Sequence, residues 1–458
     1  MAGSTSQLLD CPFGPRPPRT TPQPRSVTLP PFTAESFASL PGPGWLRSRR
    51  AAAAERFAAA DLPTQDLEVW RYSRIDDLDL DRYTPAVTEP GDEPDLPPAL
   101  RRLIEAFGPG ARVVTLHNGF PVGQVDFADD VVTVRDLRRA EQPVPLGDIA
   151  GEPDALVTLN AAACAAPIEV RIARRAVMAD PVVVVHWVDG PDALVGSHVV
   201  VRVGEGAEAQ VVEIVAGPDD ASLVVPVTEL DVADRASLGY LHLQLLGTRA
   251  WQTGLQASHV GQEATLTSAA VALGGDYARL RTDSALMAPG GTARLLAVYF
   301  GDGTQMHDFR TVQEHRAPHS LSDLLYKGAV ANRSRSVYTG LIRVEKGARG
   351  TNALQTNRNL VLDEGAHAES VPNLEIEDND VRCSHASAVG PIAEDQRYYV
   401  ESRGVPTDVA DRLIALGFLD DVLARIPVPG VIEPLRLALA AKLDEAEQLE
   451  ANLSGAVS

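Results

Sequence analysis

The sequence predicts a mainly β protein that has a β-helix at its centre and helical regions at both ends. Three observations support this prediction. Short runs rich in Val, Leu and Thr, such as Val199–Val203 and Gly340–Val344, alternate with Gly, Asp and Asn in the middle of the chain. Turn motifs recur there at a nearly fixed spacing. Between residues 200 and 390 no helical pattern of ten or more residues interrupts these runs, which excludes a sheet of βαβ units.

The N-terminal part of the chain divides into a tail and a helical region. Residues 1–30 contain seven prolines and almost no apolar pattern, which predicts a disordered tail. Residues 31–110 form the predicted helical region, in which Ala, Arg and Glu dominate the stretch Trp45–Ala60. A second helix is expected near Leu100–Phe107, after an acidic and proline-rich loop.

The predicted β-helix core covers residues 111–391, and its turns give its period. The turn motif consists of an apolar residue, two variable residues, a Gly or polar residue, and a small residue. Its fourth position falls at Gly206, Arg235, Glu263 and Gly290. The successive steps between these positions are 29, 28 and 27 residues. A constant period between about 20 and 50 residues indicates a solenoid, in which two short strands form one coil. We expect strands of about five residues. A β-sandwich stays an alternative, because turn signals roughly 8–12 residues apart also occur.

The C-terminal domain, residues 392–458, is predicted to be helical. Ala393–Ser402 forms the first helix, Thr407–Gly417 the second, and Ile432–Asn452 the last. Between the second and the last helix lies an apolar stripe, where a partner protein would dock unless the stripe packs on the end of the β-helix. The stripe consists of Phe418, Leu419, Val422 and Leu423.

Charge and cysteine usage exclude several classes of function. The chain has 62 acidic and 41 basic residues and a formal net charge of −21, whereas nucleic-acid binding needs clustered Lys and Arg. Its most apolar short run, Val182–Val185, is far below the roughly 20 residues that a membrane-spanning helix needs. The N-terminus lacks the features of a signal peptide. The cysteines, Cys11, Cys164 and Cys383, are far apart, as expected in a reducing cytosol. We therefore expect a cytoplasmic protein that binds neither nucleic acid nor membrane.

No catalytic residue is predicted, because the sequence has no phosphate-binding G-x-x-x-x-G-K-[ST] motif, no G-x-S-x-G motif and no H-E-x-x-H motif. A carbohydrate-active β-helix enzyme is an alternative, but it would need paired carboxylates in a groove. The acidic residues of this chain are instead spread over turns and terminal helices. His307, His315 and His319 lie within 13 residues and could bind a metal. Because their spacing matches no metal motif, we expect them to form hydrogen bonds across neighbouring coils.

One short segment places a thiol beside an imidazole. Cys383 and His385 are two residues apart, so on a strand they project to the same side while Ser384 points away. This pair suits iron or zinc, but it is half of a metal site, whose other ligands would come from another chain or from sulfide. A small buried thiol next to a structural histidine is the competing interpretation. Cys164, within a run of alanines, is expected to serve packing, and Cys11 lies in the predicted tail.

A series of motifs keeps its order from residue 317 to residue 405. These motifs are Ala317–Gly328, Tyr338–Gly340, Gln355–Leu362, Ala368–Ile376, Cys383–Gly390 and Tyr398–Val405. Upstream, Pro63-Thr64 is followed by Glu68, Trp70 and Tyr72 at alternate positions. In content and order these motifs resemble the SufB/SufD family of iron–sulfur cluster assembly proteins.

Within this family, the string Cys383-Ser384-His385 followed by Val389-Gly390 is similar to the SufD branch. The SufB branch usually carries a Glu-His-Glu-Ala string at this place and a Tyr-Cys pair before its Arg-Gly. This chain has Tyr399-Val400 instead, without a thiol. The SufB branch stays the close alternative.

The resemblance implies a right-handed parallel β-helix and a scaffold subunit rather than an enzyme. It implies a complex with SufB and SufC homologues, in which a transient cluster of iron and sulfide forms at the interface with SufB. ATP would bind to SufC, which docks on the C-terminal helices. The isolated chain would hold no stable cofactor, and a homodimer is one state expected of it. The resemblance assigns cluster assembly to His385, with Cys383 as a second candidate metal ligand.

Overall fold

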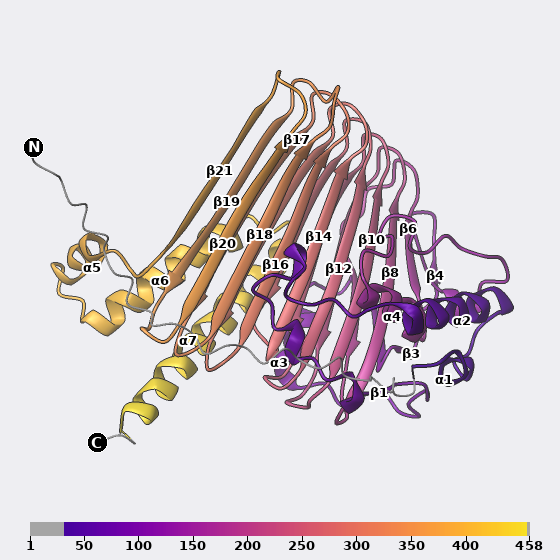
Figure 1. The fold of residues 1–458 in the computed structure, drawn as a ribbon, viewed down its shortest axis with the longest axis horizontal. Helices are drawn as coiled ribbons and strands as arrows, with labels where there is room; N and C mark the ends of the chain where they lie inside the picture. Colours follow the sequence, from indigo (N-terminus) through magenta and orange to yellow (C-terminus); the bar gives the residue numbers. More distant parts are fainter. Residues whose placement is uncertain (1–31, 456–458) are drawn as a thin grey trace, which may run out of the picture.

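In the computed structural model, which describes residues 32–455, the chain forms a parallel β-helix with helices on two sides. The expected tail over residues 1–30, with Cys11, lies outside the described residues. Each coil contributes one strand to each of two sheets, and the coils follow one another from right to left in Figure 1. The fold class expected from the sequence is therefore confirmed.

One sheet contains one strand from each coil, and we call it the even-numbered sheet after the strands β6 to β20 that form most of it. Shorter strands, β1 and β5 among them, extend it near its first edge. Its strands are β1 (Thr84–Pro85), β4 (Phe127–Ala128), β5 (Val132–Asp136), β6 (Ile168–Ile172), β8 (Ala193–Val203), β10 (Leu223–Val232), β12 (Trp251–Val260), β14 (Tyr277–Leu286), β16 (Met306–His315), β18 (Arg335–Val344) and β20 (His367–Ile376). The odd-numbered sheet contains the other strand of each coil. Its strands are β2 (Arg112–His117), β3 (Phe120–Val122), β7 (Val182–Trp187), β9 (Glu208–Ala216), β11 (Ser237–Leu245), β13 (Thr265–Ala272), β15 (Thr292–Gly301), β17 (Leu321–Val330), β19 (Asn352–Val361) and β21 (Arg382–Gly390).

The register of the odd-numbered sheet reproduces the period predicted from the turns. Glu208 pairs with Ser237, Ser237 with Thr265, and Thr265 with Thr292, so the steps are again 29, 28 and 27 residues. All these pairs are parallel, whereas a β-sandwich is built from antiparallel strands, so that alternative is excluded. The four predicted turn residues all have a positive φ, because this backbone conformation reverses the chain between the two sheets.

The strands are longer than the predicted five residues. From β8 to β21 they contain 8 to 11 residues, because they continue through polar positions that face the lumen, the space between the two sheets. These polar side chains bond to one another across the lumen. For example, Nε2 of Gln256 donates to Oγ of Ser268 over 2.9 Å. In the sequence, a polar residue within an apolar run indicates that the strand ends there, so the predicted strands were too short.

The N-terminal helices lie against the first coils. They are α1 (Ala34–Ala38), α2 (Gly44–Ala59), α3 (Pro98–Glu105) and α4 (Ala155–Ala163). α4 was not predicted from the sequence, and its N-terminus is capped by the carboxylate of Asp154. The buried guanidinium of Arg50 on α2 donates to the carbonyl oxygens of Cys164 and Ala165, at 2.9 and 2.6 Å. This contact joins the helices to the β-helix.

Residues 62–83, here called the strap, cross the outer face of the even-numbered sheet (Figure 1). The strap buries Trp70, and the guanidinium of Arg279 lies 3.8 Å from the centre of its ring. Arg279 and Arg310 both bond to the carboxylate of Asp308, at 2.6 and 2.7 Å. The two arginines also donate to the backbone carbonyl groups of Val69 and Arg71. A buried cluster of three charges therefore holds the strap.

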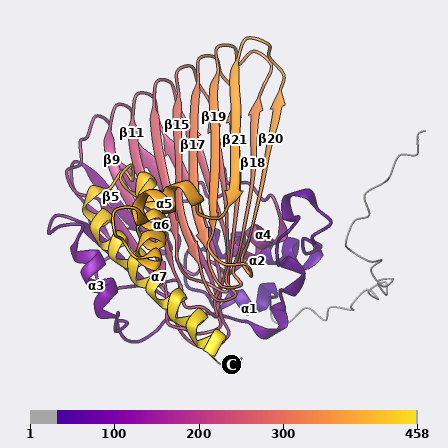
Figure 2. The same ribbon diagram turned by 90° about the vertical axis from the view of Figure 1, so that its left-hand side faces the viewer.

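Helices α5 (Glu394–Glu401), α6 (Thr407–Leu423) and α7 (Ile432–Gly455) follow the last coil. Figure 2 shows them over the outer face of the odd-numbered sheet, on the side opposite to α2 and α4. α6 continues through Gly417, where the sequence analysis expected a helix to end. Among the helices of residues 32–455, none is long and apolar enough to cross a membrane.

Candidate functional site

The β-helix ends in an open coil. β20 and β21 are the last strands of their sheets, so each has one neighbour and one free edge. In the preceding coil nearly all lumen-facing side chains are buried, whereas most of those in the last coil are partly or largely exposed because no further strand covers them. This open end, formed by the lumen-facing residues of β20 and β21, lies on the left in Figure 1.

Cys383 and His385 both face the lumen at the open end. Cys383 pairs in register with Ala353 of β19, and His385 pairs with Gln355, both of which are buried lumen residues. Ser384 pairs with the exposed Leu354 on the outer face. The prediction that Cys383 and His385 share one side of a strand is therefore confirmed. His385 is exposed and Cys383 is half-buried, so the thiol is not fully buried as the competing interpretation expected.

The thiol and the imidazole differ in their surroundings. Burial raises the pKa of the Cys383 thiol above its usual value, so the thiol stays protonated at neutral pH. A metal ion would have to displace this proton, because the thiolate is the ligand. The imidazole of His385 has an open approach and can bind a metal through either ring nitrogen.

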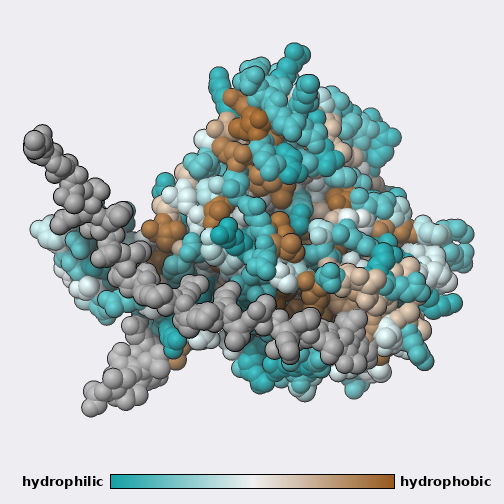
Figure 3. Space-filling model, viewed as in Figure 1, coloured by the Kyte–Doolittle hydropathy of each residue, from teal (hydrophilic) through white to brown (hydrophobic). Residues whose placement is uncertain are grey.

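Apolar side chains of the last coil are also exposed at the open end. The lumen-facing Leu374 and Ile376 of β20 are 36% and 43% exposed, and Val389 of β21 is 43% exposed. Figure 3 shows apolar surface along the upper left edge of the molecule, which is the edge formed by the last coil. Apolar side chains beside two free strand edges are typical of an interface with another chain.

Residues 32–455 do not provide a complete metal site. No group of three or more His, Cys, Asp or Glu side chains in this part of the chain could hold a metal ion. Cys383 and His385 would supply two ligands at most, while iron usually binds more than two. A cluster at the open end would therefore need further ligands from sulfide or from another chain.

The three clustered histidines do not form a site. His307 and His315 lie near opposite ends of β16 and face the lumen, while His319 lies in the following turn. A ring nitrogen of His307 is 3.1 Å from the carbonyl oxygen of Gly274, and His315 bonds to Ser320 and Ser322. The expectation of hydrogen bonds across coils is thus confirmed for His307. Burial lowers the pKa of both lumen histidines to about 4, so they are neutral at pH 7.

Cys164 serves packing, as the sequence analysis expected. Its side chain is 3% exposed, and burial raises the pKa of its thiol to about 11. It lies just after α4 and contacts the first coils. A thiol with these properties is not reactive.

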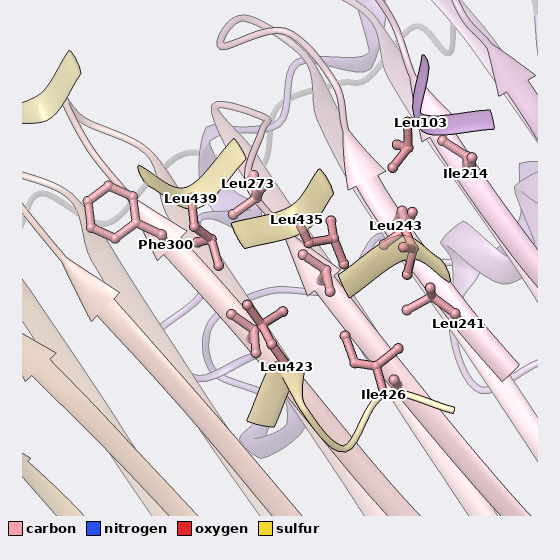
Figure 4. Close-up of a cluster of buried hydrophobic side chains, with 14 of the residues drawn as sticks. Leu103, Ile214, Leu241, Leu243, Leu273, Phe300, Leu423, Ile426, Leu435 and Leu439 are labelled. Carbon is pink, nitrogen blue, oxygen red and sulfur yellow. The ribbon is translucent and has the colours of Figure 1, made fainter. Parts of the chain in front are cut away.

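The stripe that was expected to dock a partner is largely buried, and that prediction is wrong for three of its four residues. Leu419, Val422 and Leu423 are 2%, 0% and 1% exposed and pack against the odd-numbered sheet, as Figure 4 shows for Leu423. Phe418 is half-buried, with the ammonium of Lys327 4.5 Å from the centre of its ring. The reason is the continuity of α6, which turns this face toward the β-helix.

The exposed apolar residues of the C-terminal helices lie elsewhere. Tyr398 and Tyr399 of α5 are 72% and 59% exposed, and Val409 and Leu413 of α6 are 40% and 53% exposed. Val409 and Leu413 are four residues apart, so they share one face of α6. The buried residues Ala415, Leu419 and Val422 lie on another face of α6, and their helical spacing is the signal in the sequence that distinguishes the two faces.

Comparisons with known proteins agree with the motifs in the sequence. Residues 186–418 match a family model described as "SUF system FeS cluster assembly, SufBD core domain". A SufBD family protein of Mycobacterium tuberculosis, named for iron–sulfur cluster assembly, is 34% identical over 328 residues, which cover 69% of this chain and 80% of the relative.

Two further relatives are named iron–sulfur cluster assembly protein SufD. The Escherichia coli protein is 29% identical over 240 residues, or 52% of this chain and 57% of the relative. The Bacillus subtilis protein is 36% identical over 138 residues, or 30% of this chain and 32% of the relative. The family match includes most of the coils and the strand that carries Cys383 and His385. The chain therefore belongs to the SufB/SufD family of iron–sulfur cluster assembly proteins.

Proposed function

We propose that this chain is a SufD-type scaffold subunit of a SufBCD complex, in which iron and sulfide are assembled at the open end of its β-helix. The observation that carries this proposal is the exposure of His385 on an uncapped coil, with the half-buried Cys383 on the same face of the strand. In the preceding coils, lumen-facing side chains are covered by the next strand. At the open end two candidate ligands remain accessible, beside free strand edges to which another chain can add.

In the proposed function each residue of the open end has a role. A SufB homologue would pair with the free edges of β20 and β21 and cover the exposed leucine, isoleucine and valine side chains. His385 would bind iron through one ring nitrogen, and Cys383 would bind iron or sulfide after losing its proton. The partner and sulfide would supply the remaining ligands. Iron and sulfide are cargo in this account and leave with the finished cluster.

The SufD assignment, rather than SufB, rests on two sequence features. The chain carries a Cys-Ser-His string at the open end, and α5 has Val400 where the SufB branch usually has a cysteine. We assign no catalytic residue to this chain. ATP hydrolysis belongs to a SufC homologue in this account, because the sequence has no phosphate-binding Gly-rich loop with its Lys.

Docking of the SufC homologue is assigned to the exposed apolar side chains of α5 and α6. We expect Leu413→Asp to abolish co-purification with SufC while leaving the fold intact, because this side chain is 53% exposed. By contrast, Leu419→Asp would place a carboxylate in the core and destabilise the protein. Pull-down with tagged SufC, combined with thermal melting of each variant, distinguishes the two effects.

Leu437→Asp is the matched control for the docking experiment. Leu437 is a 64% exposed leucine on α7, and its substitution should change neither melting nor co-purification. If Leu413→Asp binds SufC as well as the wild type does, this docking surface is wrong.

Co-expression with SufB and SufC homologues tests the function itself. We expect one assembly that contains all three chains and carries iron and sulfide after anaerobic purification. Native mass measurement and analysis of iron and acid-labile sulfide provide the result. A chain that purifies without either homologue, or an assembly of the three without iron, would contradict the proposed function.

A further inference from the structure

An amide without hydrogen-bond partners lies directly beneath His385. Gln355 of β19 pairs in register with His385 of β21, and both side chains face the lumen. Gln355 is 1% exposed, and neither its Oε1 nor its Nε2 has a hydrogen-bond partner. Within the described part of the chain, the imidazole of His385 forms no hydrogen bond either. Two polar groups in adjacent strands are therefore both unpaired.

Other buried glutamines in the lumen are better satisfied. Gln244, Gln252 and Gln313 each use one amide atom in a hydrogen bond, to Gly274, His242 and Ser322 respectively. A buried polar group without a partner lowers stability, and such groups in native proteins call for an explanation such as a functional role. Gln355 differs from the three deeper glutamines in its position next to the open end.

The opposite strand leaves room for the amide of Gln355. A Cβ atom at Gly340 of β18 would lie 2.3 Å from Nε2 of Gln355 and 2.3 Å from the hydroxyl oxygen of Tyr338. The φ of Gly340 is not positive, so space rather than backbone conformation requires the glycine. On β20, the buried hydroxyl group of Ser370 is also without a partner. Unpaired polar groups thus line both sheets just inside the open end.

We infer that Gln355 is a positioning residue for His385 during iron binding. This inference rests on the proposed function, because it takes His385 to be an iron ligand. A histidine that binds a metal through one ring nitrogen usually donates its other ring N–H to an oxygen atom. Oε1 of Gln355 can accept this hydrogen bond, because Gln355 faces the lumen in register with His385. With this bond formed, the second ring nitrogen keeps its lone pair for iron and points out of the open end.

If Gln355 positions His385, replacing its amide should have different effects on stability and on iron retention. Gln355→Leu keeps most of the side-chain volume and removes two unsatisfied polar atoms, so the thermal midpoint should stay the same or rise. Iron affinity should fall by about 10–100-fold, which is the usual effect of removing a residue that orients a metal ligand. A glutamine with a purely structural role would give a lower thermal midpoint instead.

Two further variants complete the experiment. Gln355→Glu keeps an oxygen acceptor at the same place and should restore iron affinity to within about fivefold of the wild type. Gln313→Leu removes the hydrogen bond to Ser322 deeper in the lumen, and it should lower the thermal midpoint without changing iron affinity. Iron affinity is measured on the co-expressed complex by competition with a ferrous chelator, and melting is measured on the same samples.

The outcomes separate this inference from the proposed function. If His385→Ala loses iron but Gln355→Leu keeps it, the inference is wrong and the function stands. If His385→Ala keeps iron, the proposed function itself fails. If Gln355→Leu melts earlier or does not assemble, the role of Gln355 is structural and the inference is overturned. Failure of Gln355→Glu to retain iron would contradict the acceptor role.

Discussion

Asp308→Ala is expected to destabilise the protein by about 3–5 kcal/mol and to release the strap from the β-helix. The carboxylate of Asp308 is fully buried and bonds to Arg279, Arg310 and the hydroxyl group of Tyr277. Burial opposes its ionisation, but the two arginines outweigh burial and hold the pKa of Asp308 below its usual value. Its removal would leave two guanidinium groups buried without their counter-ion.

Urea unfolding and limited trypsin digestion measure these two effects. The urea midpoint should fall, and trypsin should cleave at Arg71 and Arg74 of the released strap faster than in the wild type. The lowered pKa of Asp308 also means that its contribution to stability is present at neutral pH and is lost as the pH falls through that pKa.

Asp283→Ala is the matched control for this prediction. Asp283 lies on the same face of the neighbouring strand β14, but its carboxylate is 28% exposed and pairs with Arg281. Loss of such a partly exposed ion pair should change stability by less than about 1 kcal/mol. Equal urea midpoints for the two variants would show that the charge cluster under the strap does not stabilise the fold.

The turns made most of the fold predictable from the sequence. Gly206, Arg235, Glu263 and Gly290 mark positions where the backbone needs a positive φ, and their spacing equals the register of the sheet. The strand lengths could not be predicted in the same way. Polar residues such as Gln256 interrupt the apolar pattern in the sequence, and only the opposite sheet provides their partners.

The candidate site was predictable in part. The two-residue period of a strand places Cys383 and His385 on one side, and it does so without knowledge of the fold. Their exposure depends on the absence of a further coil, which the strand itself does not reveal. The prediction that Leu419, Val422 and Leu423 dock a partner was wrong because Gly417 was taken as the end of a helix. A glycine inside a helix costs about 1 kcal/mol, and the buried contacts of Leu419 and Val422 outweigh this cost.

His385→Ala is expected to lower the iron and sulfide content of the co-expressed complex at least about tenfold. The substitution removes a candidate ligand at the open end, where the structure offers no second imidazole among the lumen-facing residues of β20 and β21. Because His385 is exposed, its loss removes little buried surface and should leave melting unchanged. The mass of the complex should also be unchanged.

His367→Ala is the matched control, because His367 is an exposed histidine of the same coil that bonds to Glu369 rather than facing the lumen. The decisive measurement is the number of iron and sulfide ions per purified complex for the wild type, His385→Ala and His367→Ala. We expect a loss of cluster in His385→Ala alone, with all three complexes equal in mass and melting temperature. Equal cluster content in all three, or a His385→Ala complex that falls apart, would contradict the assignment of cluster assembly to the open end.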